Sequence, residues 1–160
     1  MEVSLLLDRV KIQSELLVPL LKGLREELGV EMANEIVFRS LRKHLKNHYQ
    51  LLAESKPGSG KDKWSALSAD MLVTIGDNLE IEHPRDDEQA LNLNVIGCRY
   101  AQHFLQIQEP ALGSILTCEL DNYTVSVSKG EVTLKRPRTI MQGDSKCEFR
   151  YEFQKSRNDV

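Results

Sequence analysis

The first half of the chain carries apolar residues at helical spacing. Over Asp8–Leu28 leucines and isoleucines recur every three or four residues, which predicts an amphipathic helix with a kink or a division at Pro19. Gly29 is a typical helix stop signal, and the spacing resumes at about Glu31–Glu54. A shorter helical pattern covers Trp64–Val73. This half is therefore predicted to be helical.

The second half alternates apolar and polar residues in two places. Leu79–His83 and Leu91–Val95 flank a turn at Pro84–Asp87, which predicts a β-hairpin. Glu131–Arg138 and Lys146–Gln154 predict a second hairpin. One face of the last strand carries Cys147, Phe149, Tyr151 and Phe153.

Helical spacing returns between the two hairpins. Cys98–Gln108 has this spacing, and Pro110 suits the first position of a further helix that extends to about Asp121. The next residues, Asn122–Ser128, alternate like a strand. The predicted fold class is α+β, in which the N-terminal helices and a central helix pair pack on an antiparallel sheet formed by two β-hairpins.

The length of 160 residues suits one domain. We expect residues 1–160 to form it, with a helical half at about 8–75 and a hairpin–helices–hairpin half at about 78–154. The 21 basic and 24 acidic residues give a net charge of −3, so neither nucleic acid nor an anionic membrane is expected as a partner. The oligomeric state is left open.

Location is also predicted from sequence. No apolar run approaches the roughly 20 residues that span a bilayer. The start, Met1–Asp8, has no basic segment before its short apolar run and no small-residue cleavage site, so we expect a cytoplasmic protein. In that compartment the three cysteines are expected to be free thiols.

The cysteines are the candidate reactive groups. Cys118 lies near the end of the Pro110 helix, and Asp121, three residues on, falls on an adjoining face. Cys147 starts the last strand on its apolar face. Cys98 stands where the first hairpin gives way to a helix, and a helix N-terminus lowers the pKa of a thiol. The alternatives are inert buried thiols, or a metal site of the three cysteines and a carboxylate, which no Cys-x-x-Cys pair supports.

Arginines accompany the cysteine-bearing segments. Arg99, Arg136 and Arg138 lie near them in sequence, and a guanidinium is a common partner of a small carboxylate. For Arg136 and Arg138 a solvated strand face is the alternative.

Three blocks of the second half keep the order and spacing of a known family. They are Cys98-Arg99-Tyr100-Ala101, then Pro110-x-Leu112-Gly113 leading to Cys118-x-x-Asp121, and then Thr139-Ile140-Met141-Gln142-Gly143 with Cys147-Glu148-Phe149-Arg150-Tyr151. Together with Glu27-Leu28-Gly29 and Ala33, they make about residues 10–153 resemble the L-2-amino-thiazoline-4-carboxylic acid hydrolase family.

The resemblance implies a small cytoplasmic bacterial hydrolase. We expect no cofactor and assign no metal ligands, and whether a metal is bound is left open. The family's namesake opens a five-membered cyclic isothiourea to a carbamoyl-cysteine. Its chemistry suits Cys118 as the nucleophile, with Cys147 as second choice and Asp121 positioning or deprotonating the thiol. Arg99 or Arg136 would bind the carboxylate, and the matched Thr139 and Cys98 are further candidates for substrate binding.

Three features depart from the family pattern. After Asp121 the family usually has Phe and a helical stretch, where this chain has the strand-like Asn122–Ser128. Gln102 stands where an acidic residue is expected, and Lys146 stands where the family often has a histidine before the last cysteine. If these residues line the pocket, a substrate other than the namesake compound is expected. The alternatives to a thiol hydrolase are a non-catalytic small-molecule-binding module, similar to domains that resemble 4-vinyl reductase, and a metal-dependent hydrolase.

Overall fold

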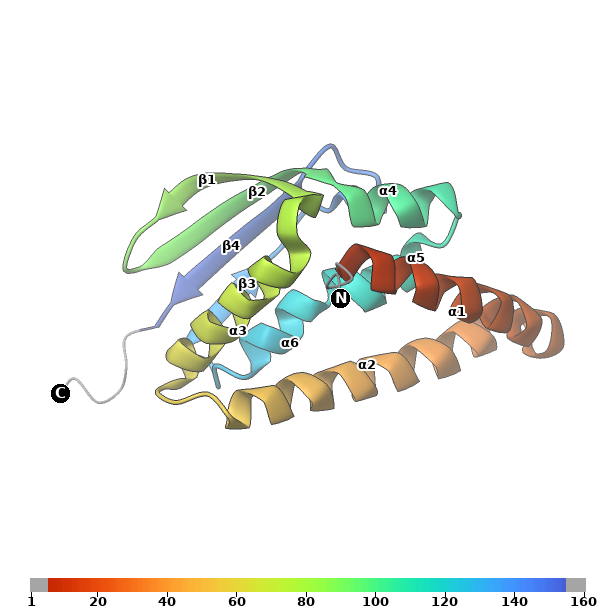
Figure 1. The fold of residues 1–160 in the computed structure, drawn as a ribbon, viewed down its shortest axis with the longest axis horizontal. Helices are drawn as coiled ribbons and strands as arrows, with labels where there is room; N and C mark the ends of the chain where they lie inside the picture. The colour runs from red at the N-terminus through yellow and green to blue at the C-terminus, as the bar shows by residue number, and fades with distance from the viewer. Residues whose placement is uncertain (1–5, 155–160) are drawn as a thin grey trace, which may run out of the picture.

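Two long helices form the N-terminal part of the protein. The computed structural model describes residues 6–154, and residues 1–5 and 155–160 lie outside that range. Residues 1–5 belong to the segment used above to argue against secretion. Helix α1 (Leu6–Leu28) and helix α2 (Val30–Glu54) lie side by side (Figure 1). The predicted division at Pro19 does not occur, because α1 continues through it as one helix. Gly29 joins the pair with a φ of 83°, a left-handed conformation that glycine adopts without steric cost.

Helix α3 (Gly60–Ile75) connects this pair to the sheet. It starts with a capping box, in which the Ser59 hydroxyl accepts from the Asp62 N–H and the Asp62 carboxylate accepts from the Ser59 N–H. This cap sets the start of α3 four residues before the predicted Trp64. A short 3₁₀ turn, η1 (Gly76–Asn78), then leads into the first strand.

Both predicted hairpins form, and together they make one antiparallel sheet. In the described part of the chain its strands are β1 (Leu79–Asp86), β2 (Ala90–Cys98), β3 (Val132–Lys135) and β4 (Cys147–Phe153). Their order is β1-β2-β4-β3, so the two hairpins join through β2 and β4, with Val95 opposite Cys147. The α+β fold class is confirmed.

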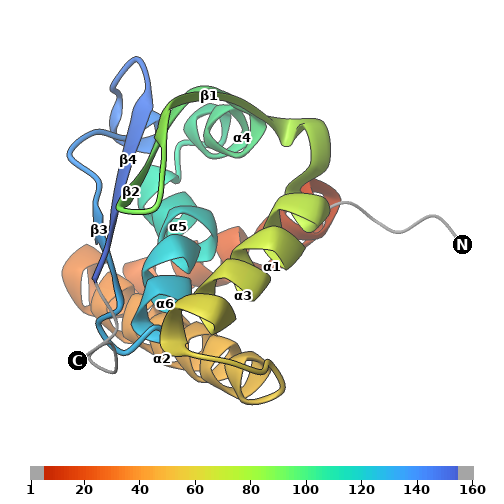
Figure 2. The same ribbon diagram turned by 90° about the vertical axis from the view of Figure 1, so that its left-hand side faces the viewer.

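Further helical segments lie between the hairpins in sequence. They are α4 (Arg99–Gln106), α5 (Pro110–Gly113), the π-helical turn η2 (Ser114–Cys118) and α6 (Leu120–Ser126). Figure 2 shows the sheet nearly edge-on with the helices gathered on one side of it. The apolar face of β4 is turned toward them, because Cys147, Phe149 and Tyr151 line a cavity shared with α3 and α6.

The strand predicted over Asn122–Ser128 is wrong, since most of this segment is helix α6. Its alternating apolar residues fit a strand when read locally. In the fold, however, Tyr123 is buried, and Val127, four residues on, packs with Ala53 of α2 and Leu67 of α3. Thr124 and Ser128 are buried beside these two residues. Burial at positions i, i+1, i+4 and i+5 follows the face of a helix, whereas a strand would bury alternate residues, so tertiary packing overrides the local pattern.

The main core lies where α1 and α2 meet α4, α5 and η2. At its centre Phe104 and Leu112 are fully buried, and Gly113 packs directly against the Phe104 ring. A Cβ on Gly113 would lie 2.4 Å from Cγ of Phe104, so this close approach requires glycine. Within residues 6–154 no helix combines the length and the apolar character needed to cross a membrane.

Candidate functional site

A cavity of about 150 Å³ lies between α3, the η2–α6 segment and the inner face of the sheet. Most of its wall is aliphatic or aromatic, with contributions from Trp64 of α3 and Leu93 of β2. The polar groups of the wall are the three thiols, the Asp121 carboxyl and the hydroxyls of a few Ser, Thr and Tyr side chains. An apolar cavity of this volume is large enough for a ring the size of benzene.

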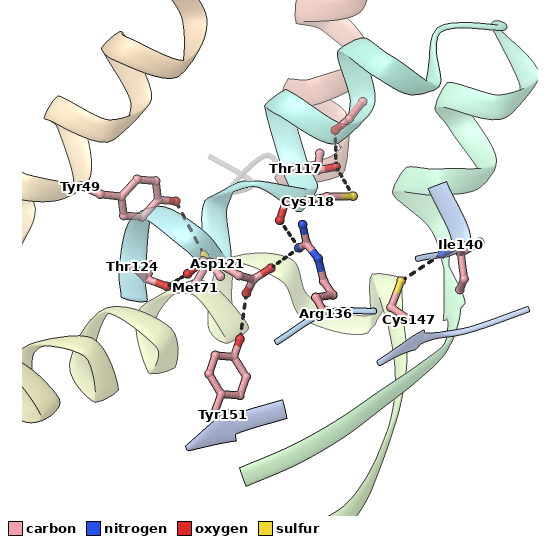
Figure 3. Close-up of polar contacts among 11 residues, drawn as sticks. Tyr49, Met71, Thr117, Cys118, Asp121, Thr124, Arg136, Ile140, Cys147 and Tyr151 are labelled. Carbon is pink, nitrogen blue, oxygen red and sulfur yellow. Dashed lines mark hydrogen bonds and ion pairs between the residues drawn. The ribbon is translucent and has the colours of Figure 1, made fainter. Parts of the chain in front are cut away.

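The fold brings all three cysteines to this cavity. Cys98 ends β2, Cys118 ends η2, and Cys147 begins β4, and each lines the wall as a free thiol. Figure 3 shows Cys118, Cys147, Asp121 and Arg136 gathered in one region. The candidate catalytic residues predicted from sequence thus lie around a single cavity.

A π-helical turn sets the position of Cys118. The Glu119 N–H donates to the carbonyl of Ser114, five residues back, at 2.8 Å, and the Thr117 hydroxyl donates to the carbonyl of Gly113 at 2.7 Å. The wide turn interrupts the single helix predicted from Pro110 to Asp121, leaving α5 and α6 on either side. Such turns are rare and occur frequently at functional sites.

Asp121 has two side-chain partners, Tyr151 of β4 and Arg136, which follows β3. The Tyr151 hydroxyl donates to Oδ1 at 3.3 Å, and Nη1 of Arg136 lies 3.6 Å from Oδ2 (Figure 3). Burial raises the pKa of Asp121 to about 6, although the Arg136 charge and the Tyr151 hydrogen bond act to lower it. A carboxyl with a pKa near neutrality can both accept and return a proton, as general acid–base catalysis requires.

Burial dominates the ionisation of the thiols as well. It raises the pKa of Cys118 to about 11, against smaller lowering effects of the Thr117 hydroxyl and Arg136. Cys98 lies at a helix N-terminus as predicted, but the expected lowering of its pKa does not follow. Its sulfur caps α4 and accepts from the Ala101 N–H at 3.3 Å, but burial still raises its pKa. Desolvation of the thiolate outweighs the helix N-terminus here, so the free protein keeps its thiols protonated near neutral pH.

Arg136 organises the site from outside the cavity wall. Besides the Asp121 carboxylate, its Nη1 contacts the backbone carbonyl of Cys118, and its guanidinium lies 5.5 Å from the centre of the Phe149 ring. The side chain is only 14% exposed. Arg136 therefore ties β3–β4 to the η2–α6 segment and fixes Cys118 and Asp121 relative to each other.

Arg99 and Thr139, both candidates for substrate binding, do not line the cavity. Arg99 is exposed at the start of α4. Thr139 is buried and caps η3 (Ile140–Gln142), its hydroxyl accepting from the Gln142 N–H. The turn that Thr139 holds presents the Ile140 N–H, which donates to the Cys147 sulfur at 3.2 Å.

Several cavity residues were not identified from the sequence. Tyr151 shares the apolar strand face with Cys147, so the alternation of the last strand carried a usable signal for it. Trp64, Ser68 and Met71 line the cavity from α3, which is far from the cysteines in sequence. Nothing in the local pattern of α3 points to a site, because only the packing of α3 over the sheet brings these residues there.

The metal-dependent alternative gains no support from the geometry. Within residues 6–154 no group of three or more His, Cys, Asp or Glu side chains is arranged to hold a metal ion.

The fold and the site define the class of protein. It is an α+β protein whose helices and sheet enclose a small cavity that carries thiols and a carboxyl of near-neutral pKa.

The family follows from comparison with known proteins. Residues 9–151 match the profile of the L-2-amino-thiazoline-4-carboxylic acid hydrolase family, so the chain belongs to this hydrolase family, as its sequence blocks predicted. No curated protein matches the chain.

Proposed function

We propose that this protein is a hydrolase that opens a small cyclic amidine or isothiourea ring, with Cys118 as the nucleophile. The observation that carries the proposal is that Cys118 and Asp121 line one cavity and are fixed by the same arginine. Membership of the hydrolase family supports the reaction class. The family's name supplies the type of ring.

The reaction takes place at the amidine carbon of the ring, which is bonded to two nitrogens and, in an isothiourea, also to sulfur. The Cys118 sulfur attacks this carbon and forms a tetrahedral adduct. One ring bond from the carbon then breaks, and its electron pair stays on the departing ring atom, which takes a proton. The carbon remains attached to the enzyme through a C–S bond.

Water completes the cycle. A water molecule gives a proton to a base and attacks the same carbon, and the Cys118–carbon bond breaks with its electrons returning to sulfur. The product of an isothiourea carries a urea or thiocarbamate carbonyl, and the product of a simple amidine carries an amide carbonyl. In each case the carbonyl oxygen came from water. The net change is the addition of one water molecule to one substrate molecule.

Asp121 is the proposed proton carrier for these steps. With its pKa at about 6 it is largely ionised at neutral pH and can accept the thiol proton, then deliver it to the departing ring atom. In the free protein this transfer is unfavourable by about 7 kcal/mol, because the Cys118 pKa is about 11. A protonated amidine in the cavity places a positive charge beside the sulfur and lowers this cost, so the thiolate forms only when substrate is bound.

Serine substitutions test the assignment. We expect Cys118→Ser to lower kcat for ring opening of 2-amino-thiazolines by about 10³-fold or more with the fold intact, as for loss of a nucleophile. Cys98→Ser and Cys147→Ser are the matched controls, since each removes one thiol from the same cavity. Mass spectrometry of wild-type protein mixed with substrate should show a covalent adduct on the peptide that contains Cys118.

The controls also define how the proposal fails. If Cys147→Ser abolishes turnover and Cys118→Ser does not, the nucleophile is Cys147. If none of the three substitutions lowers kcat, the thiol mechanism is wrong.

The apolar wall and the raised thiol pKa values favour a second candidate, a non-catalytic module that binds a small apolar molecule. This candidate predicts saturable binding without ring opening by the wild-type protein. Turnover that is lost in Cys118→Ser excludes it.

A further inference from the structure

Among residues 6–154, no cationic side chain lines the cavity. Among the described residues that line it there is no Lys, Arg or His, and the titratable groups are the three thiols, two tyrosines and the Asp121 carboxyl. A carboxylate entering this space would meet an acidic group and an apolar wall. The cost of desolvating that carboxylate would have no partner to offset it.

The nearest guanidinium is already engaged. Arg136 faces Asp121 and the Cys118 carbonyl and is not part of the wall, while Arg99 is exposed and outside the cavity. A substrate carboxylate that paired with Arg136 would have to reach beyond the cavity wall and compete with the Asp121 carboxylate for the same positive charge. Among residues 6–154, the cavity wall therefore offers no guanidinium fork of the kind that normally selects a small carboxylate.

The remainder of the cavity suits an apolar group. Leu72 and Trp64 of α3 face the sheet across it, and Ile81 and Leu91 contribute from β1 and β2.

We propose that the substrate of this protein is a small cyclic amidine that bears an apolar substituent and no carboxylate. The protonated amidine pairs with Asp121 beside Cys118, and the substituent packs between α3 and the sheet. This inference rests on the proposed function for the reaction and adds the substrate class to it. The cavity volume of about 150 Å³ limits the molecule to one ring and a short substituent.

Binding can be measured apart from catalysis, because the single tryptophan of the chain lies in the cavity wall. Fluorescence titration would compare 4-propyl-2-amino-thiazoline with 2-amino-thiazoline-4-carboxylate on wild-type protein. Each buried methylene contributes about fourfold in affinity. We expect the Kd of the propyl compound to be at least about tenfold lower than that of the carboxylate.

Two partly exposed leucines provide a test variant and its matched control. Leu72 lines the cavity and is 51% exposed at its edge, so Leu72→Ser should fold; Leu105, 42% exposed on α4 and outside the cavity, is the matched control. We expect Leu72→Ser to raise the Kd of the propyl compound several-fold and to leave that of the carboxylate unchanged. Leu105→Ser should change neither.

Parallel turnover assays separate the two proposals. If wild-type protein binds the carboxylate compound more tightly than the propyl compound, and Arg136→Gln loses this preference, the proposed substrate class is wrong. Ring opening of the carboxylate compound would still leave the proposed function standing. Tight binding of the propyl compound without ring opening of either compound supports the ligand class and rejects the hydrolytic mechanism.

Discussion

The Asp121 carboxyl is predicted to cost the folded protein stability. Its pKa rises from 3.8 to about 6 on folding because the side chain is buried, with 19% of it exposed. A carboxyl whose pKa is raised by folding stabilises the fold below its unfolded pKa, and this contribution is lost as the pH rises through the folded pKa. The full loss is about 3 kcal/mol above neutral pH.

Replacing Asp121 by asparagine removes this cost. Asparagine is neutral and nearly isosteric, and its amide oxygen can still accept from the Tyr151 hydroxyl. We expect Asp121→Asn to be more stable than wild type by up to about 3 kcal/mol near pH 8. The gain should shrink to about 1 kcal/mol near pH 4.5, where the folded wild-type carboxyl is already protonated.

The assay is urea unfolding of both proteins at the two pH values, monitored by circular dichroism. The free energies of unfolding are compared where the m-values of the two proteins agree. Turnover should fall at the same time, since the variant has no group to move the proton. A variant that is less stable than wild type near pH 8, or a gain that does not depend on pH, would falsify the assignment of a raised pKa to Asp121. A more stable variant with unchanged turnover would instead remove Asp121 from the mechanism.

Three further predictions concern packing, electrostatics and thiol reactivity. Gly113→Ala should lower the free energy of unfolding in urea by about 1–3 kcal/mol, because the new Cβ would overlap the Phe104 ring. The control Gly23→Ala should be neutral or slightly stabilising, because a Cβ at Gly23 has no atom within 4 Å. Equal effects of the two substitutions would contradict the close approach of Gly113 to Phe104. Arg136→Gln should raise the pKa of Asp121 above about 6 and shift the acidic limb of the pH profile of kcat to higher pH. An unshifted acidic limb would show that Arg136 does not act on this carboxyl. Without substrate, iodoacetamide should label all three thiols more slowly than free cysteine near neutral pH, and one fast thiol would contradict their raised pKa values.

Local patterns in the sequence determined most of the elements. The apolar spacing and Gly29 predicted α1 and α2, and period-two alternation predicted both hairpins. These features are encoded locally, because the period of a buried face differs between helix and strand. The order and spacing of the cysteine-bearing blocks were enough to identify the family.

Tertiary structure decided what the site can do. It turned the alternating segment after Asp121 into α6, inserted the π-helical turn before it, and left Arg99 outside the cavity. It also buried the thiols and Asp121, which raised their pKa values against the helix N-terminus and Arg136. Desolvation and the choice of partners depend on which distant segments pack together, and spacing along the chain does not contain that information.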